Sequence, residues 1–189
     1  MVVTLLAFFL LALSATAAPI RRANPCFVTG SVALPAEVAD GLPAIENAVT
    51  CNTAVQVAPG VPDLISGGIA YSTIDFQKSN LSPIGFALQT FATPSDPATA
   101  DLTTLQNQLN DYLALEAGTR SQPNSSVLLT KLKGPKFFLQ FQIARVKTAQ
   151  GQTLDVADTV EHQLGKVTKN AVGASAAEIA QVNALATQL

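Results

Sequence analysis

The chain contains one histidine, His162, and a catalytic triad of the Ser-His-Asp type would have to use it. Asp158 lies four residues earlier, one turn away on a helix, where its carboxylate could orient the imidazole ring. No G-x-S-x-G motif, the usual setting of a nucleophilic serine in α/β-hydrolases, occurs in the sequence. Since an Asp and a His one turn apart are more often a surface pair, the sequence supports a triad only weakly.

Paired carboxylates are a second arrangement that could do chemistry, because glycoside hydrolysis needs two acids at a defined separation. The candidate acids lie near the predicted strands and the cysteines: Asp63, Asp75, Glu37, Asp40 and Glu46. No recognisable motif surrounds them, so solvated acids are the simpler interpretation. A small secreted hydrolase with a carboxylate or Ser-His site is therefore the alternative hypothesis for function.

Metal and nucleotide motifs are missing from the sequence. One His and two Cys do not make a zinc ligand set, and no D-x-D-x-D-G calcium loop occurs. Glu161 and His162 are adjacent, so they do not form the Glu-x-x-His motif of di-iron carboxylate proteins. No phosphate-loop pattern surrounds Gly67 and Gly68. We expect no metal and no cofactor.

Residues 117–154 contain no acid, although the chain carries 13 acidic side chains in total. The basic residues of this stretch are Arg120, Lys131, Lys133, Lys136, Arg145 and Lys147. If the last five converge, they form an anion-binding patch that meets an anionic wall polymer or a host protein. Alternatively, these side chains solvate different faces of one apolar element. Nucleic acid is not an expected partner, because the chain is acidic overall and predicted to be secreted.

The N-terminus predicts a signal peptide over residues 1–17. The apolar run 5–13 is too short to span a bilayer, and Ala15-Thr16-Ala17 supplies the A-x-A pattern of a cleavage site. Arg21-Arg22 is either a second processing site, which would make Ala23 the mature start, or a solvated basic tail. No later run is long enough to cross a membrane. We expect a secreted, extracellular protein without a transmembrane segment.

Two modifications follow from secretion. Cys26 and Cys51 are the only cysteines, so an oxidising compartment predicts that they pair with each other. Asn124-Ser125-Ser126 is a glycosylation sequon in a polar loop. Asn80-Leu81-Ser82 also matches the sequon, but the Pro83 that follows makes its modification doubtful.

The pattern of apolar residues predicts an α+β, mainly helical fold. Residues 23–189 form one globular domain, with a disulfide-pinned strand-rich part over 26–78 and a four- to five-helix bundle over 82–189. The expected strands are 26–34, 54–58 and 69–76. The expected helices begin after Ser82, span 102–118 and 135–150, run from about 156 to 172, and follow a capping box at Ser175.

The stretch from Pro135 to Gly151 is the predicted centre of the fold. Read as a helix, it starts at Pro135, ends at Gly151 and carries two apolar seams that pack on neighbours at both sides. A strand is the rival interpretation, because Phe137, Leu139, Phe141 and Ile143 also alternate. Length and composition favour the helix. We expect Phe141 and Leu109 to be nearly fully buried.

Three segments resemble a group of small secreted fungal proteins of unknown function: CFVTGSVALP at 26–35, EAGTRS at 116–121, and GPKFFLQFQIARVKTAQG at 134–151. The resemblance covers almost the whole mature chain. It implies secretion and provides no catalytic motif to transfer. The leading hypothesis is therefore a secreted, non-catalytic protein that binds a cell-wall, surface or host component.

Overall fold

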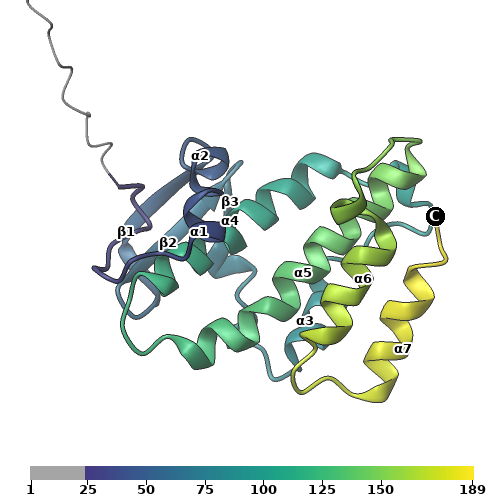
Figure 1. Ribbon diagram of the computed structural model, residues 1–189. Coiled ribbons are helices and arrows are strands. Elements are labelled where there is room, and N and C mark those ends of the chain that lie inside the picture. The colour runs from purple at the N-terminus through teal and green to yellow at the C-terminus, as the bar shows by residue number, and fades with distance from the viewer. Residues whose placement is uncertain (1–23) are drawn as a thin grey trace, which may run out of the picture.

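The computed structural model describes residues 24–189, so the predicted signal peptide over 1–17 and the Arg21-Arg22 site lie outside the described residues. The elements, in chain order, are α1 (Ala36–Ala39), α2 (Leu42–Ile45), β1 (Val49–Ala58), β2 (Val61–Ser66), β3 (Ile69–Ala70), α3 (Pro83–Thr90), α4 (Leu102–Arg120), α5 (Ser126–Ala149), α6 (Val160–Lys169) and α7 (Ala176–Leu185). The sheet, α1 and α2 lie at one end of the molecule, and α3, α6 and α7 at the other (Figure 1). The prediction of a mainly helical mixed fold with strands near the N-terminus is confirmed.

The sheet has the order β1-β2-β3, and both pairs of neighbours are antiparallel. Val49 pairs with Ser66 at one end of the β1–β2 ladder, and Ala58 pairs with Val61 at the turn. The register shifts twice along β1, between Asn52 and Gln56 and again before Ala58. Pro62 lies within β2 and pairs with Gln56 at one of these shifts.

Two strand predictions are wrong. Residues 26–34 form turns and bends, because Gly30 N donates to Ser121 Oγ (3.0 Å) and Val32 N donates to the Ser121 carbonyl (2.9 Å). The C-terminal end of α4 thus takes the hydrogen bonds that a neighbouring strand would need. The strand expected over 69–76 ends after Ala70, where the chain enters two short 3-10 turns. Buried Asp63 accepts the Ser72 N–H (2.9 Å) and holds the first of these turns.

The disulfide between Cys26 and Cys51 is confirmed, with 6.1 Å between the two Cα atoms. It joins the N-terminal segment to β1, and α1 and α2 lie in the loop that it closes. A covalent link of this kind lowers the entropy of the unfolded chain and holds a segment that has little core of its own.

Helix α5 packs against α3, α4 and α6, so the central position predicted for this stretch is confirmed and the strand interpretation is wrong. Its predicted start at Pro135 is also wrong, because α5 begins at Ser126 and contains Pro135. A proline inside a helix removes one hydrogen bond. Here Pro135 is buried, and burial of Leu132 and its neighbours offsets that loss.

Side-chain caps begin four of the described helices, α3, α4, α6 and α7. Ser82 Oγ accepts the Gly85 N–H, and Ser175 forms the predicted capping box with Glu178. Gly151 follows α5 with a φ of +76°, a conformation that suits glycine at a helix end. Gly118, however, does not end α4, which continues to Arg120. A Cβ at Gly118 would lie 2.6 Å from the Phe27 carbonyl oxygen, so glycine is needed there for close packing.

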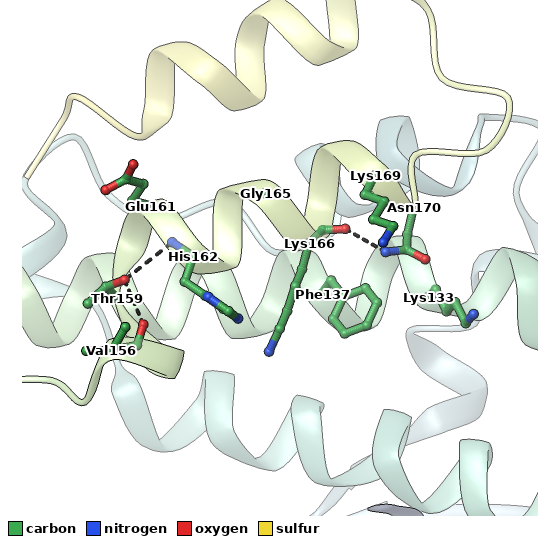
Figure 2. Close-up of a pocket in the computed structure, with 10 residues that line it drawn as sticks. All are labelled: Lys133, Phe137, Val156, Thr159, Glu161, His162, Gly165, Lys166, Lys169 and Asn170. Carbon is green, nitrogen blue, oxygen red and sulfur yellow. Dashed lines mark hydrogen bonds between the residues drawn. The ribbon is translucent and has the colours of Figure 1, made fainter.

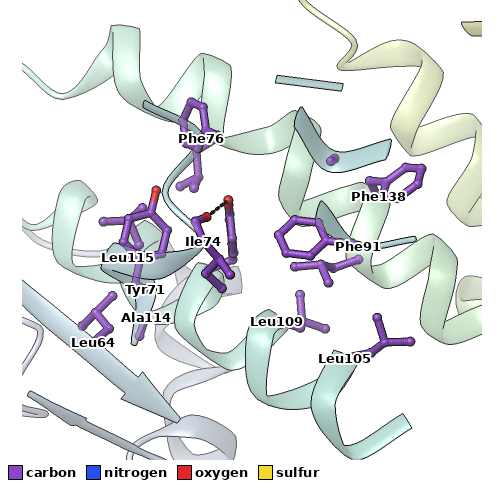
Figure 3. Packing of buried hydrophobic residues seen from close by; sticks show 14 of the residues in the cluster. Leu64, Tyr71, Ile74, Phe76, Phe91, Leu105, Leu109, Ala114, Leu115 and Phe138 are labelled. Atoms are coloured by element: carbon purple, nitrogen blue, oxygen red, sulfur yellow. Dashed lines mark hydrogen bonds between the residues drawn. The ribbon is translucent and has the colours of Figure 1, made fainter. Parts of the chain in front are cut away.

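One hydrophobic core connects the sheet end to the helical end. Phe141 is 0% exposed and Leu109 is 6% exposed, which confirms the burial predicted for both. Figure 3 shows part of this core, in which the segment after the sheet contributes Tyr71, Ile74 and Phe76. None of the helices described between residues 24 and 189 has the length and hydrophobicity needed to span a bilayer.

Candidate functional site

A cleft of about 730 Å³ lies between α5, α6 and the turn that precedes α6, and we call it the outer cleft. Its lining residues are Lys133, Phe137, Val156, Thr159, Glu161, His162, Gly165, Lys166, Lys169 and Asn170. Figure 2 shows the Phe137 ring between Lys166 and Lys133. Three lysines thus share the cleft with a single carboxylate, Glu161.

Helical spacing brings these side chains together. On α5, Lys133 and Phe137 are four residues apart, and on α6, His162, Lys166 and Lys169 follow at intervals of four and three. Residues at these intervals lie on one face of a helix. Because α5 and α6 pack against each other, the two faces meet at the cleft.

Local hydrogen bonds fix both ends of α6. Thr159 Oγ1 accepts the His162 N–H (3.3 Å) at its start, and Asn170 Nδ2 donates to the Lys166 carbonyl (2.8 Å) at its end, as Figure 2 shows. The C-terminal turn of a helix carries partial negative charge, which stabilises Lys166 and Lys169 there. This stabilisation does not require an acidic partner.

Two lysine ammonium groups lie near the Phe137 ring, one from α5 and one from α6. Lys136 Nζ lies 4.5 Å from the ring centroid and Lys166 Nζ lies 6.0 Å from it. Contacts of this kind are attractive, because the face of an aromatic ring is electron-rich. The half-buried Phe137 ring therefore holds Lys166 at the edge of the cleft.

A second, more enclosed cavity of about 440 Å³ adjoins the outer cleft, and we call it the inner cavity. The two share Lys133, Phe137 and Lys166 in their walls. The other lining residues of the inner cavity are Glu37, Val38, Gly41, Leu42, Ile45, Leu113, Glu116, Ala117, Arg120, Lys136 and Gln140. Together the two cavities are lined by five cationic side chains and three carboxylates.

Glu116 organises the charges of the inner cavity. Its Oε1 accepts Arg120 Nε (3.0 Å) and Nη2 (2.9 Å), and its Oε2 accepts the Lys136 ammonium. Burial raises the pKa of Glu116, but the charges and hydrogen bonds of Lys136 and Arg120 outweigh burial and leave the pKa below its ordinary value. Glu116 is therefore an ionised structural carboxylate with two cationic partners.

The predicted anion-binding patch of Lys131, Lys133, Lys136, Arg145 and Lys147 is not one exposed surface. Lys136 is buried against Glu116. Lys147 lines other cavities, and 14 residues of helix separate it from Lys133, or about 21 Å. Lys131 is exposed but is not among the residues that line the cleft or the inner cavity. Of the five, only Lys133 reaches the outer cleft.

Arg145 is buried and held by three hydrogen bonds. It is 1% exposed and donates to Gln142 Oε1 (2.6 Å), Thr93 Oγ1 (3.1 Å) and the Gln188 carbonyl (2.7 Å). Burial lowers the pKa of its guanidinium. Arg145 thus ties α5 to the segment after α3 and to the C-terminal segment, and it is not available to a ligand from solvent.

The acids and the histidine considered for hydrolysis lie in several parts of the protein. His162 lines the outer cleft, whereas Asp158 lines a separate cavity of about 160 Å³. Asp63 is buried, and its Oδ2 accepts the Ser72 hydroxyl (2.6 Å). Asp75 is also buried and its Oδ1 accepts the Tyr71 hydroxyl (3.0 Å).

The remaining candidate acids, Glu37, Asp40 and Glu46, belong to the α1–α2 region, where Glu37 and Asp40 are exposed. Glu37 lines the inner cavity, and the other carboxylate there, Glu116, is occupied by its two cations. In the part of the chain that the structure describes, no group of three or more His, Cys, Asp or Glu side chains is placed to hold a metal ion.

Asn124 is exposed in the short connection between α4 and α5, with a φ of 60°. Such a position leaves the side-chain amide accessible, so glycosylation at the predicted sequon remains a prediction. At the second sequon, Ser82 Oγ already caps α3 and donates to Glu178 Oε1 (2.9 Å).

Residues 28–189 match a family model described as Domain of unknown function (DUF7143). The chain belongs to the DUF7143 family. No curated protein and no solved structure matches it. In this DUF7143 chain, the outer cleft is therefore the feature that bears on function.

Sequence reasoning on the DUF7143 chain missed Lys166, Lys169 and His162 as companions of Lys133. The acid-free window ended at Asp155, before α6 begins. The sequence signal that could have identified these residues is the presence of lysines on one face of each of two consecutive helices. Each helix carries one of the two faces: Lys133 and Phe137 on α5, and Lys166 and Lys169 on α6. Only the packing of α5 against α6 brings these faces together.

Proposed function

We propose that this protein is a secreted, non-catalytic binding protein whose outer cleft holds an anionic group of its ligand. The observation that carries this proposal is the meeting of Lys133, Lys166 and Lys169 beside Phe137, with Glu161 as the single carboxylate in the lining. Three ammonium groups carried by two packed helices can offer charge-assisted hydrogen bonds to a carboxylate or phosphate. The disulfide fits an oxidising, extracellular compartment.

The ligand classes expected from the sequence, an anionic wall polymer or an acidic region of a host protein, both carry such groups. A cleft that is open to solvent can bind one charged unit of a larger molecule. A hydrolase using a carboxylate or Ser-His site is the alternative, and the separate cavities lined by Asp158 and His162 do not favour it.

The test compares a cleft variant with a matched control. Lys133→Gln, Lys166→Gln and Lys169→Gln remove the cleft cations, whereas Lys131→Gln and Lys147→Gln remove lysines of α5 that lie outside the cleft. Lys136 is left intact, because its loss would unpair the buried Glu116. Binding of inorganic pyrophosphate and of a soluble polyuronate is measured by isothermal titration calorimetry at low salt and at about 0.15 M, where screening shortens to about 8 Å.

We expect the wild type and the control to bind, more weakly at the higher salt, and the cleft variant to lose at least tenfold in affinity. Circular dichroism checks that all three are folded. Equal loss in the control and the cleft variant, or no binding of either anion by the wild type, would contradict the proposal.

A further inference from the structure

The inner cavity has an apolar wall that the proposed function does not use. Val38, Leu42 and Ile45 from the α1–α2 region face it, together with Leu113 and Ala117 from α4. At about 440 Å³ it falls in the size range of sites for small organic molecules. This wall favours contact with an apolar group.

The charges at the inner cavity are paired only in part. Both oxygens of Glu116 are taken up by Arg120 and Lys136, so this acid presents no free negative charge. Glu37 is exposed, and its side chain can remain in solvent. The inner cavity is lined by four cationic side chains and two carboxylates, so an apolar body fits there best when it carries an anionic head that offsets the excess positive charge.

The position of the junction between the two cavities defines how a ligand would lie. Lys133, Phe137 and Lys166 belong to both linings, so cationic groups stand where the apolar cavity opens into the outer cleft. A charged head at the junction would contact Lys133 and Lys166, and an attached apolar body would face Phe137 and Leu113.

We propose that the ligand of this site is a small amphipathic anion, a carboxylate with one alkyl or aromatic body, whose head lies at Lys133 and Lys166 and whose body fills the inner cavity. This inference rests on the proposed function, because it uses the same lysines. It goes further by naming the ligand class. A polymer or a protein surface would engage the outer cleft alone.

The test uses a series of straight-chain carboxylates: acetate, butanoate, hexanoate and octanoate. Burial of each added methylene should raise affinity by up to about fourfold until the inner cavity is full. Octanol, which has the same alkyl body without the charge, should bind at least tenfold more weakly than octanoate. Calorimetry at constant ionic strength below the micellar range of octanoate gives each affinity.

Val38 is a half-buried residue of α1 that lines the inner cavity, so Val38→Trp should fill the cavity. Val32→Trp is the matched control. Val32 is 45% exposed and lies in the same disulfide loop but outside the cavity. We expect Val38→Trp to lose at least tenfold in octanoate affinity and to bind pyrophosphate as the wild type does. Val32→Trp should behave as the wild type with both. Thermal melting confirms that each variant is folded.

The outcomes separate the two proposals. In one outcome, pyrophosphate or polyuronate binds through the cleft lysines, but carboxylate affinity does not depend on alkyl chain length. This outcome overturns the amphipathic-anion inference and leaves the proposed function standing. Binding of octanol as tight as that of octanoate also overturns the inference, because the head would then contribute nothing. If no anion of either kind binds the wild type, both proposals fail.

Discussion

Glu116 of α4 and Lys136 of α5 form an ion pair inside the protein, with side chains only 8% and 10% exposed. Removing one member of a buried pair leaves the other charge without compensation. The pair therefore stabilises the contact between the two longest helices, and Lys136, expected at first to contact a ligand, has a structural role.

Glu116→Gln should lower the free energy of unfolding by about 3–5 kcal/mol, because the Lys136 ammonium remains buried without a counter-ion. Urea denaturation measures the change. Glu161→Gln, which alters an exposed carboxylate of α6, is the control and should change stability by less than about 0.5 kcal/mol. If the two variants unfold at the same urea concentration, the pair does not stabilise the fold.

A second buried acid predicts a dependence on pH. Asp111 is 0% exposed, and neither of its carboxylate oxygens has a hydrogen-bond partner among the described residues. Burial, with the nearby charge of Asp63, raises the pKa of Asp111 to about 8. Because the unfolded value is near 4, the folded protein holds a proton that the unfolded chain releases between these two values. Its stabilising effect is complete below pH 4 and is lost as the pH rises to about 8.

From pH 5 to pH 8, we therefore expect the wild type to lose stability by up to about 1.4 kcal/mol per pH unit from this residue alone. Asp111→Asn should remove most of this slope and raise stability at pH 8, since the amide carries no charge. Asp40→Asn, at an exposed position, should leave the slope unchanged. Denaturation curves at four pH values provide the measurement, and a wild type with a flat profile over this range would contradict the assignment.

Glu116 gives stability the opposite dependence on pH. Its pKa in the folded protein is lowered, so its contribution is present above the ordinary glutamate value near 4.5 and is lost as the pH falls through the folded value. With Asp111 favouring acid and Glu116 opposing strong acid, we expect these two residues together to give maximal stability at about pH 4–4.5.

Phe141→Ala should cost about 3–5 kcal/mol, because the ring is fully buried on the central helix and its removal leaves a cavity. Phe137→Ala, on the same helix but half-buried, should cost less. Differential scanning calorimetry compares the two. Were Phe141→Ala to melt within a degree or two of the wild type, α5 would not be the centre of the core.

Cys51→Ser should lower stability by about 3–4 kcal/mol, since the disulfide closes a loop with a sequence separation of 25. The helical signal in circular dichroism should persist, because α3 to α7 lie outside that loop. Mass spectrometry of the native protein should show no free thiol, and two free thiols would rule out the bond.

Local signals made the helical half of the protein predictable. Ser82 and Ser175 act on backbone groups within three residues, so a sequence pattern identifies them. The N-terminal segment was not predictable in this way. Its partner, Ser121, lies 91 residues from Gly30, and no pattern near Gly30 indicates a contact over that distance.

The same distinction explains the partial success at the site. The sequence identified a basic segment, but a count of charges along one helix does not say which of them are buried. Lys136 and Arg145 find partners on α4 and on the C-terminal segment, and Lys133 gains Lys166 as a neighbour from α6. Each of these relationships depends on how helices pack, which periodicity alone does not determine.

The two register shifts of β1 have a consequence for how the protein behaves at high concentration. Sheets recruit other chains along open edges, and this sheet has two such edges, β1 and β3. The irregular pairing of β1 bends the strand, and β3 offers a ladder of only two residues. Among the described residues, neither edge is therefore a good template for pairing with a strand of another copy of the chain.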